Sequence, residues 1–132
     1  MPEAQRKDFH LYVDEFANFC TDSFTSILSE ARKYRLCLTL SHQYLAQVPE
    51  QIRNAVLGNV GTILCFRVSE SDAQILAREI GGGYSAAYIS GLRNYEVCVR
   101  MMENGGSGEA FSGHTIGPLM LNYGRHENVR RG

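Results

Sequence analysis

The sequence predicts an α/β fold in which a mostly parallel sheet packs against helices. Three continuous apolar runs have the length of buried strands, and each of them ends in polar residues. Segments with helical periodicity separate these runs. Strands that alternate with helices are typical of right-handed βαβ crossovers, which build parallel sheets. The three runs are residues 9–13, 36–40 and 62–68.

Length and composition narrow the range of functions. With 132 residues, the chain is long enough for one domain with a single core. Hydrophobic residues make up 44% and charged residues 20%, which is the balance of a globular protein. The formal net charge of -1 excludes a broad basic surface, so any contact with DNA must be local. No apolar run has the length of a membrane span or a secretion signal, and we expect a soluble, cytoplasmic protein.

The first strand, residues 9–13, ends in Asp14 and Glu15. A helix is expected after it, because Asp22 or Ser23 can cap its start and apolar residues then recur three and four positions apart. The carboxylates of Asp14 and Glu15 are thus expected at the carboxyl end of this apolar strand.

The second strand, residues 36–40, ends in the polar sequence Ser-His-Gln at 41–43. Pro49 suits the first turn of a short helix that spans roughly 49–57, and Gly58 is a natural stop. Polar groups thus stand again at the carboxyl end of a strand.

The third strand, residues 62–68, is rich in β-branched and aromatic side chains. It leads into a helix whose Ser71-x-x-Gln74 sequence resembles a capping box, and the glycines from Gly81 onward end that helix.

The last part of the domain is predicted to be a C-terminal β-hairpin. Residues 95–102 alternate like a strand, residues 104–108 form a glycine-rich loop, and a partner strand is expected around 110–115. We divide the chain into a polar lead, one domain and a flexible tail, which are residues 1–8, 9–117 and 118–132.

The cysteines and histidines do not suggest a metal site. They are widely and irregularly spaced, without a C-x-x-C pair. Three of the four cysteines lie in strand-like runs, where we expect them to be small buried hydrophobic residues in a reducing compartment. The cysteines are Cys20, Cys37, Cys65 and Cys98, and the histidines are His10, His42, His114 and His126.

Asp14, Glu15 and Gln43 are expected to meet at one edge of the sheet, because ligands of parallel sheets bind at the carboxyl ends of the strands. In nucleoside triphosphatases, one such acid holds Mg²⁺ through its water shell and the next polarises the attacking water. A carboxamide beside them can bond a γ-phosphate or orient the water. The alternative is that these are ordinary polar residues at strand ends that reach solvent.

Several segments in this order resemble the hexameric P-loop ATPases that pump DNA, above all the type IV secretion and conjugation coupling proteins of the TraD and TraG type, with their HerA and FtsK relatives. The resemblance covers about residues 9–117. It rests on the sequences Leu-Tyr-Val-Asp-Glu-Phe-Ala-Asn-Phe at 11–19, Ser-Glu-Ala-Arg-Lys-Tyr-Arg at 29–35, Leu-Thr-Leu-Ser-His-Gln at 38–43, Gly-Asn-Val-Gly-Thr at 58–62, the helix from Ser71, and the strand that begins near Leu92.

The resemblance implies a role for four residues. Asp14 and Glu15 correspond to the Walker B motif, with Asp14 holding Mg²⁺ through water and Glu15 as the catalytic acid that polarises the attacking water. Gln43 corresponds to the sensor of the γ-phosphate. Arg32 corresponds to an arginine finger that reaches the nucleotide of a neighbouring subunit. Arg35 stands where relatives usually have glycine, which puts the backbone shape of that turn in doubt.

The implied fold is an incomplete RecA-like three-layer sandwich. A P-loop requires G-x-x-x-x-G-K-[ST], but the lysines are Lys7 and Lys33, and neither lies in such a sequence. In the family, the P-loop strand lies between the sensor strand and the next one, so 36–40 and 62–68 would border an empty slot. We expect the chain to repack, close the gap or dimerise through those edges. We also expect no tightly bound ATP or Mg²⁺ and negligible ATPase activity from this chain alone.

Two alternatives remain open. The chain could be a non-catalytic, ATPase-like interaction or assembly module, which the missing P-loop favours. A receiver-like or flavodoxin-like domain would fit the length, but it predicts a lysine on a late strand, where this chain offers Arg67 and Arg100. For the parent protein, the resemblance implies a hexamer, DNA contacts through pore loops, and a membrane secretion complex as partner at the inner face of the membrane.

Overall fold

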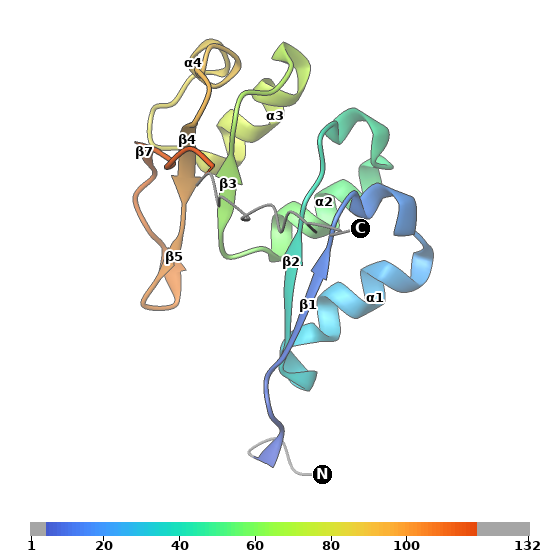
Figure 1. Cartoon of the computed structure of the whole chain (residues 1–132). Coiled ribbons are helices and arrows are strands. Elements are labelled where there is room, and N and C mark those ends of the chain that lie inside the picture. The colour runs from blue at the N-terminus through green and yellow to red at the C-terminus, as the bar shows by residue number, and fades with distance from the viewer. Residues whose placement is uncertain (1–4, 119–132) are drawn as a thin grey trace, which may run out of the picture.

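The computed structural model describes residues 5–118 (Figure 1). Helices and strands alternate through the first two thirds of this part, and short strands follow. In chain order the elements are β1 (Phe9–Val13), η2 (Phe16–Phe19), α1 (Asp22–Glu30), η3 (Ala31–Tyr34), β2 (Leu36–Leu40), η4 (Leu45–Gln47), α2 (Glu50–Asn59), β3 (Ile63–Cys65), α3 (Glu70–Ile80), α4 (Ala86–Ser90), β4 (Glu96–Arg100), β5 (Met102–Glu103), β6 (Gly106–Ser107) and β7 (Phe111–His114), where η marks a 3-10 helix.

The strands form three small sheets. β1 and β2 are parallel, with Phe9 opposite Leu36 and Val13 opposite Leu40. β3, β4 and β7 form an antiparallel sheet in that order, and β5 pairs with β6 as a hairpin. The α/β class is therefore confirmed, together with a β-hairpin at the carboxyl-terminal side of the fold.

The expectation of one mostly parallel sheet is wrong for the described residues. Only β1 and β2 pair in parallel there, and no ladder joins β2 to β3. The physical reason for the antiparallel part lies in the helices after β3. α3 and α4 pack against each other and return the chain to the end where β3 finishes, so β4 runs back beside β3 (Figure 1). The gap between β2 and β3 is not closed by pairing of these two strands.

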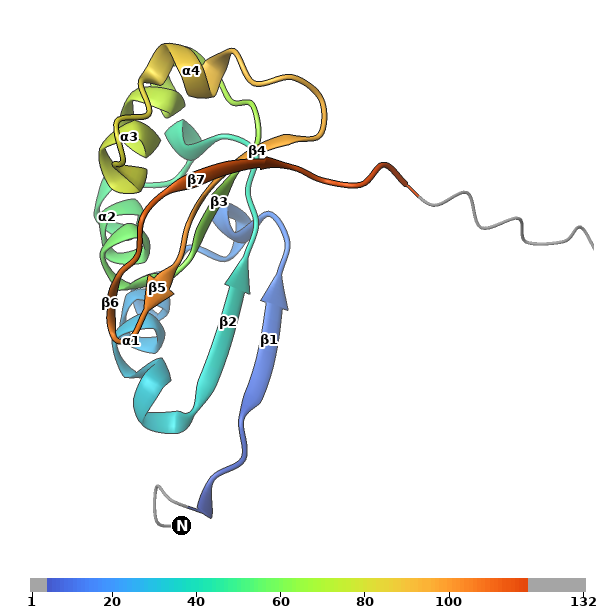
Figure 2. The same cartoon turned by 90° about the vertical axis from the view of Figure 1, so that its left-hand side faces the viewer.

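Two hydrophobic cores support the two larger sheets. The first joins β1 and β2 to α1 and α2, and the second joins β3 and β4 to α3 and α4. Their buried residues are Phe16, Phe24, Leu28, Val48, Ile52 and Val56 in the first core, and Ile63, Cys65, Ala73, Leu76, Ile80, Ile89, Leu92 and Cys98 in the second. The helices lie on one side of the strands, and the opposite face of β1 and β2 is open in the described part of the chain (Figure 2). On that face stand exposed side chains such as Tyr12 and Thr39.

The helices lie where the periodicity places them, but their ends differ. α2 continues through Gly58 to Asn59, and Pro49 is its N-cap rather than a first-turn residue. The capping box assigned to Ser71 and Gln74 is wrong. α3 begins two residues earlier, and the Ser69 hydroxyl accepts the hydrogen bond from the Asp72 amide at 3.4 Å.

The strands after α3 are shorter than expected. β3 covers only Ile63–Cys65 of the predicted range 62–68, and the predicted strand 95–102 is divided into β4 and β5. β7 lies within the expected partner segment and pairs with β4. The short helix α4 was not predicted, because five residues are too few to show helical periodicity. Of the tail expected at 118–132, residues 119–132 lie outside the described part.

The three cysteines that lie in strands differ in burial. Cys65 and Cys98 are buried as expected, and burial raises the pKa of the Cys65 thiol to about 12. Cys37 is exposed on the open face of β2, so the expectation that it is buried is wrong. Within residues 5–118, no three His, Cys, Asp or Glu side chains gather to hold a metal ion. No helix of this part combines the length and apolarity that crossing a membrane requires.

Candidate functional site

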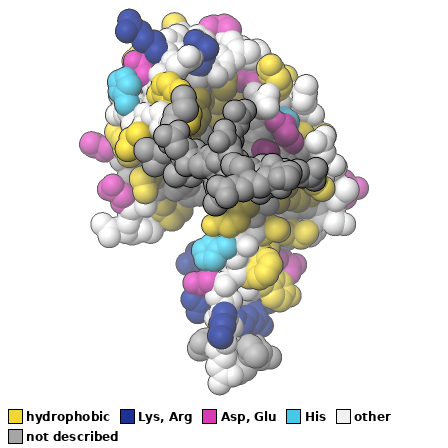
Figure 3. Space-filling view, in the orientation of Figure 1, with side chains coloured by type: hydrophobic (Ala, Val, Ile, Leu, Met, Phe, Trp, Pro, Cys, Tyr) yellow, Lys and Arg dark blue, Asp and Glu magenta, His cyan; other side chains and the backbone are white. Residues whose placement is uncertain are grey.

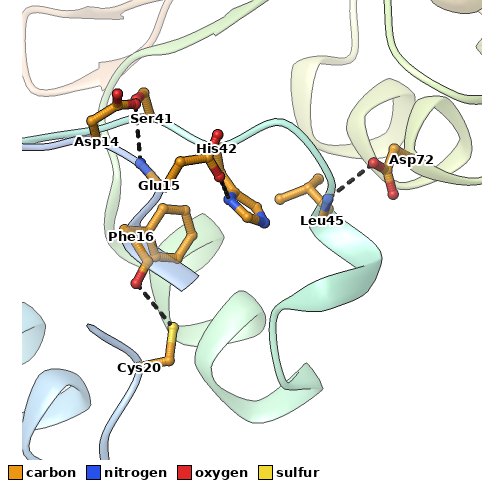
Figure 4. Close-up of polar contacts among 8 residues, drawn as sticks. All are labelled: Asp14, Glu15, Phe16, Cys20, Ser41, His42, Leu45 and Asp72. Carbon is orange, nitrogen blue, oxygen red and sulfur yellow. Dashed lines mark hydrogen bonds and ion pairs between the residues drawn. The ribbon is translucent and has the colours of Figure 1, made fainter. Parts of the chain in front are cut away.

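The in-register pairing of β1 and β2 brings two polar loops together. Because Val13 stands opposite Leu40, residues 14 and 15 emerge beside residues 41 and 42. Backbone bonds continue the pairing beyond the strands. The Ser41 amide donates to the Val13 carbonyl at 2.9 Å, and the Phe16 amide donates to the Ser41 carbonyl at 3.1 Å. The loops therefore form one connected edge (Figure 4).

Asp14 is oriented from both loops. The Ser41 hydroxyl and the Glu15 amide donate to the same Asp14 oxygen, Oδ1, the latter at 3.0 Å. The residue is nevertheless exposed. Its carboxylate is thus fixed in direction but accessible to a ligand from solvent.

Glu15 is held by a histidine. Its Oε2 lies 2.8 Å from Nδ1 of His42, whose side chain is only 3% exposed, whereas the Glu15 side chain is 34% exposed. A carboxylate only accepts hydrogen bonds, so the imidazole donates from Nδ1. The Glu15 backbone has a φ of 50°, a left-handed conformation that costs a non-glycine residue about 1 kcal/mol or more. Strain and a buried partner together fix this carboxylate.

An aromatic floor supports the pair. Phe16 is buried, and its ring stacks on Phe24 with centroids 6.1 Å apart. The same ring meets the imidazole of His42 edge to face at 5.3 Å. These contacts anchor the histidine in the first core, so the position of the Glu15 carboxylate is tied to the packing of α1.

A buried acid connects the second loop to α3. Asp72 is 1% exposed, and its Oδ2 accepts the amide of Leu45 at 2.9 Å. Neither Asp72 Oδ1 nor His42 Nε2 has a hydrogen-bond partner among the described residues. Two unpaired buried polar atoms therefore flank the loop that carries Gln43, and burying such atoms costs free energy.

The other two predicted site residues lie in different places. Gln43 is exposed in the loop between His42 and η4, at the edge that carries the acids. Arg32 is exposed on η3, just before β2, and so lies at the opposite end of that strand. The structure brings Asp14, Glu15 and Gln43 to one edge and leaves Arg32 outside it.

Arg32 belongs to a basic end of the molecule. Arg6 donates to the Lys33 carbonyl at 2.6 Å, and both side chains lie over the Tyr34 ring. Lys and Arg side chains gather at this lower end of the molecule in the space-filling view (Figure 3). The local basic surface faces away from the acidic edge.

Although Arg35 stands where relatives usually have glycine, the turn before β2 keeps a backbone conformation typical of glycine. Its φ is 56°, in the left-handed region where glycine is free of strain. Its Nε bonds Asp8 Oδ1 at 2.7 Å, and this contact lowers the pKa of the Asp8 carboxyl. The turn before β2 thus has the shape that glycine prefers, although an arginine occupies it.

At this edge, the carboxylates of Asp14 and Glu15 can both contact a polar ligand. An exposed, oriented carboxylate can bind a hydrated divalent cation, and a second one can accept a proton from water. Residues 5–118 contain no glycine loop with a lysine between a strand and a helix, so they offer no phosphate cradle of that type.

Sequence reasoning left His42 and Asp72 without a role. A signal for His42 exists, because Glu15 and His42 are separated by 27 residues, as are the paired residues of β1 and β2. Asp72 has no comparable signal, because its contact with Leu45 depends on how α3 packs.

Comparison with known proteins gives one family and one fold. Residues 8–92 match the family described as the TraM recognition site of TraD and TraG. The structure is similar to that of the bacterial conjugative coupling protein TrwBdeltaN70 in its unbound monoclinic form, with a TM-score of 0.70 at 14% identity. The match covers 86% of this chain and 33% of that one, so this chain spans about a third of its length. No curated protein sequence matches.

Proposed function

The chain belongs to the family of the TraM recognition site of TraD and TraG, and from this premise we propose that it is the carboxyl-terminal half of a P-loop ATPase core that drives DNA transfer. This agrees with the sequence-based resemblance to conjugation coupling proteins, which the family match and the structural likeness confirm. The observation that carries the proposal is the pair Asp14 and Glu15 at the end of β1, oriented by Ser41 and His42 from β2.

The proposed chemistry divides the two acids. The donor set fits Mg²⁺, because Asp14 is an exposed carboxylate whose Oδ1 is already bonded. Asp14 would accept hydrogen bonds from water molecules around the ion. Glu15 would orient the attacking water and take its proton, and His42 would keep the Glu15 carboxylate in place. When bound, Mg²⁺ and ATP supply the charge neutralisation and the reacting phosphate.

Gln43 and Arg32 take the remaining roles. Gln43 is exposed at the acidic edge, where a carboxamide can bond a γ-phosphate. Arg32 lies at the other end of β2 and would act on the nucleotide of a neighbouring subunit, which requires a ring-like assembly such as a hexamer. Its position far from the acids of its own chain supports this division.

The phosphate cradle would come from outside these residues. A P-loop strand would lie between β2 and β3, which are not paired with each other, and would complete an incomplete RecA-like sheet. DNA would contact pore loops of the assembly through its phosphates. We place the protein in the cytoplasm, next to a membrane secretion complex.

The test is hydrolysis by the product of the complete coding sequence that contains these residues. We expect Glu15→Gln to lower kcat at least 100-fold while ATP still binds, because the amide cannot take the proton. The control is Glu30→Gln, an exposed acid at the end of α1, which should keep full activity. Full activity in Glu15→Gln would contradict the proposal.

Partner binding is the second candidate function. The family description names a recognition site for TraM, and the open face of β1 and β2 offers exposed side chains for a partner. In this reading the chain is a non-catalytic interaction module. It predicts that Glu15→Gln leaves DNA transfer unchanged, whereas substitutions on the open face abolish it.

A further inference from the structure

Two buried cysteines face each other across adjacent antiparallel strands. Cys65 on β3 stands directly opposite Cys98 on β4, and these two strands lie side by side (Figure 1). Side chains at directly opposite positions share one face of a sheet, and both of these belong to the second core. Cys65 is 4% exposed and Cys98 is 0% exposed. None of the roles proposed above uses either thiol.

The spacing of the two strands suits a disulfide bond. Directly opposite residues of antiparallel strands have Cα atoms about 4.5 to 5.5 Å apart. Disulfides join residues whose Cα atoms are about 4.4 to 6.8 Å apart. Both cysteines are free thiols. Burial is the main reason that the pKa of the Cys65 thiol rises to about 12, and the neighbouring Cys98 adds to the rise, which requires that the two sulfurs lie close together.

Burial protects both thiols while the sheet is closed. The thiolate is the nucleophile in disulfide exchange, and burial raises the pKa of Cys98 as well as that of Cys65. Reaction therefore requires a local opening of the structure. Such an opening is easiest at β3, because it has only three residues and lies at an edge of its sheet within residues 5–118.

We propose that Cys65 and Cys98 are a modification site, a redox pair that closes into a cross-strand disulfide when it meets a small disulfide such as oxidised glutathione. The Cys65 thiolate attacks one sulfur of oxidised glutathione, so that a mixed disulfide forms and one glutathione thiolate leaves. The Cys98 thiolate then attacks the Cys65 sulfur and displaces the second glutathione. The two protein thiols are oxidised to one disulfide, and the glutathione disulfide is reduced to two thiols, which take up the two protons that the cysteines lose.

The disulfide locks β3 to β4 and encloses α3 and α4 in a covalent loop. In a reducing compartment the pair stays as two thiols, so the cross-link forms only under oxidising conditions. The modification goes beyond the proposed function and does not rest on it, because it needs neither ATP nor a neighbouring subunit.

The experiment is peptide mapping of the full 132-residue chain after incubation in buffers with a rising ratio of oxidised to reduced glutathione. The remaining thiols are alkylated before digestion with trypsin. The four cysteines lie in four different tryptic peptides, with Cys65 in residues 54–67 and Cys98 in residues 94–100. We expect these two peptides, joined by a disulfide, to be the main cross-linked product, and a reducing agent should separate them.

Cys37 supplies the internal control, because it is exposed and stands opposite His10 rather than another cysteine. It should stop at the mixed disulfide with glutathione. The link between Cys65 and Cys98 should form at least tenfold more slowly than this adduct, because β3 must open first. Cys37→Ser should leave the link unchanged.

Cys98→Ala removes the second thiol of the pair. Cys65 should then stop at the mixed disulfide with glutathione, and the melting temperature checks that this core variant folds. The peptide map of the unaltered chain decides the question if the variant does not fold.

Three outcomes overturn the proposal. In the first, Cys65 and Cys98 stay reduced at every glutathione ratio while Cys37 reacts. In the second, the main cross-links join either of them to Cys20 or Cys37. In the third, the link forms in concentrated urea but not in native buffer, which would show that the folded strands hold the two sulfurs apart.

Discussion

At the scale of single residues, the position of the Glu15 carboxylate depends on His42. The imidazole is buried against Phe16 and donates to Glu15 Oε2 at 2.8 Å. A buried donor restricts a carboxylate that would otherwise sample several rotamers. His42 is thus a positioning residue in the proposed mechanism, because it acts only through Glu15.

Substitutions at His42 separate positioning from packing. In the product of the complete coding sequence, His42→Ala should lower kcat for ATP hydrolysis about tenfold with little change in KM. His42→Asn keeps a donor near the position of Nδ1 and should recover most of the loss. If both variants lose activity equally, together with thermal stability, His42 serves the core alone.

The left-handed backbone of Arg35 yields a second prediction at this scale. Arg35→Gly and Arg35→Ala both remove the contact with Asp8, but only glycine relieves the strain. We expect Arg35→Gly to have a free energy of unfolding about 1 kcal/mol higher than that of Arg35→Ala. Urea denaturation of the two variants measures the difference, and equal midpoints would show that the position carries no strain.

At the scale of elements, the start of α3 depends on one serine. The Ser69 hydroxyl accepts the Asp72 amide, and the Asp72 carboxylate accepts the Leu45 amide. The Ser69 cap therefore stabilises the first turn of α3. Asp72 in that turn holds the loop that follows Gln43 through its bond to the Leu45 amide.

Ser69→Ala should lower the free energy of unfolding by about 1 kcal/mol, because the first turn of α3 loses its cap. Ser71→Ala is the matched control. Its hydroxyl contacts only Ser69 among the described side chains, and its replacement should cost less than half as much. A larger loss for Ser71→Ala, measured by chemical denaturation, would contradict the observed cap.

Some of the helices and strands could be predicted from the sequence, and others could not. The strands at Phe9–Val13 and Leu36–Leu40 and the helices α1 to α3 followed from apolar runs and helical spacing, which are local properties. The pairing of β3 with β4 did not follow, because it depends on where α3 and α4 return the chain. The cap was misplaced by two residues because Ser69 and Ser71 are both plausible caps by sequence.

The site was predictable to a similar degree. Asp14, Glu15 and Gln43 were identified because each follows an apolar strand, and the structure places all three at one edge. The roles of His42 and Asp72 needed the register of β1 and β2 and the packing of α3. A hollow lined by Phe66, Arg67, Arg93, Tyr95 and Thr115 joins three segments that are distant in the sequence, so no local sequence pattern predicts it.

At the scale of the whole molecule, the proposed function requires a P-loop strand that residues 5–118 do not supply. β2 and β3 are not paired with each other, and the helices cover only one side of β1 and β2 (Figure 2). Both features fit a core that is completed by further chain, and this chain spans about a third of the similar coupling protein. Exposed strand edges also promote association, so the chain alone should self-associate in light-scattering measurements.

The DNA sequence immediately upstream of the codon for Met1 is the most direct test of the proposed function. We expect an in-frame strand, a G-x-x-x-x-G-K-[ST] loop and a helix, which together would fill the gap between β2 and β3 and hold the phosphates opposite Asp14 and Glu15. A natural reading frame that opens at Met1 would contradict it, because the acids would then have no anchored nucleotide on which to act.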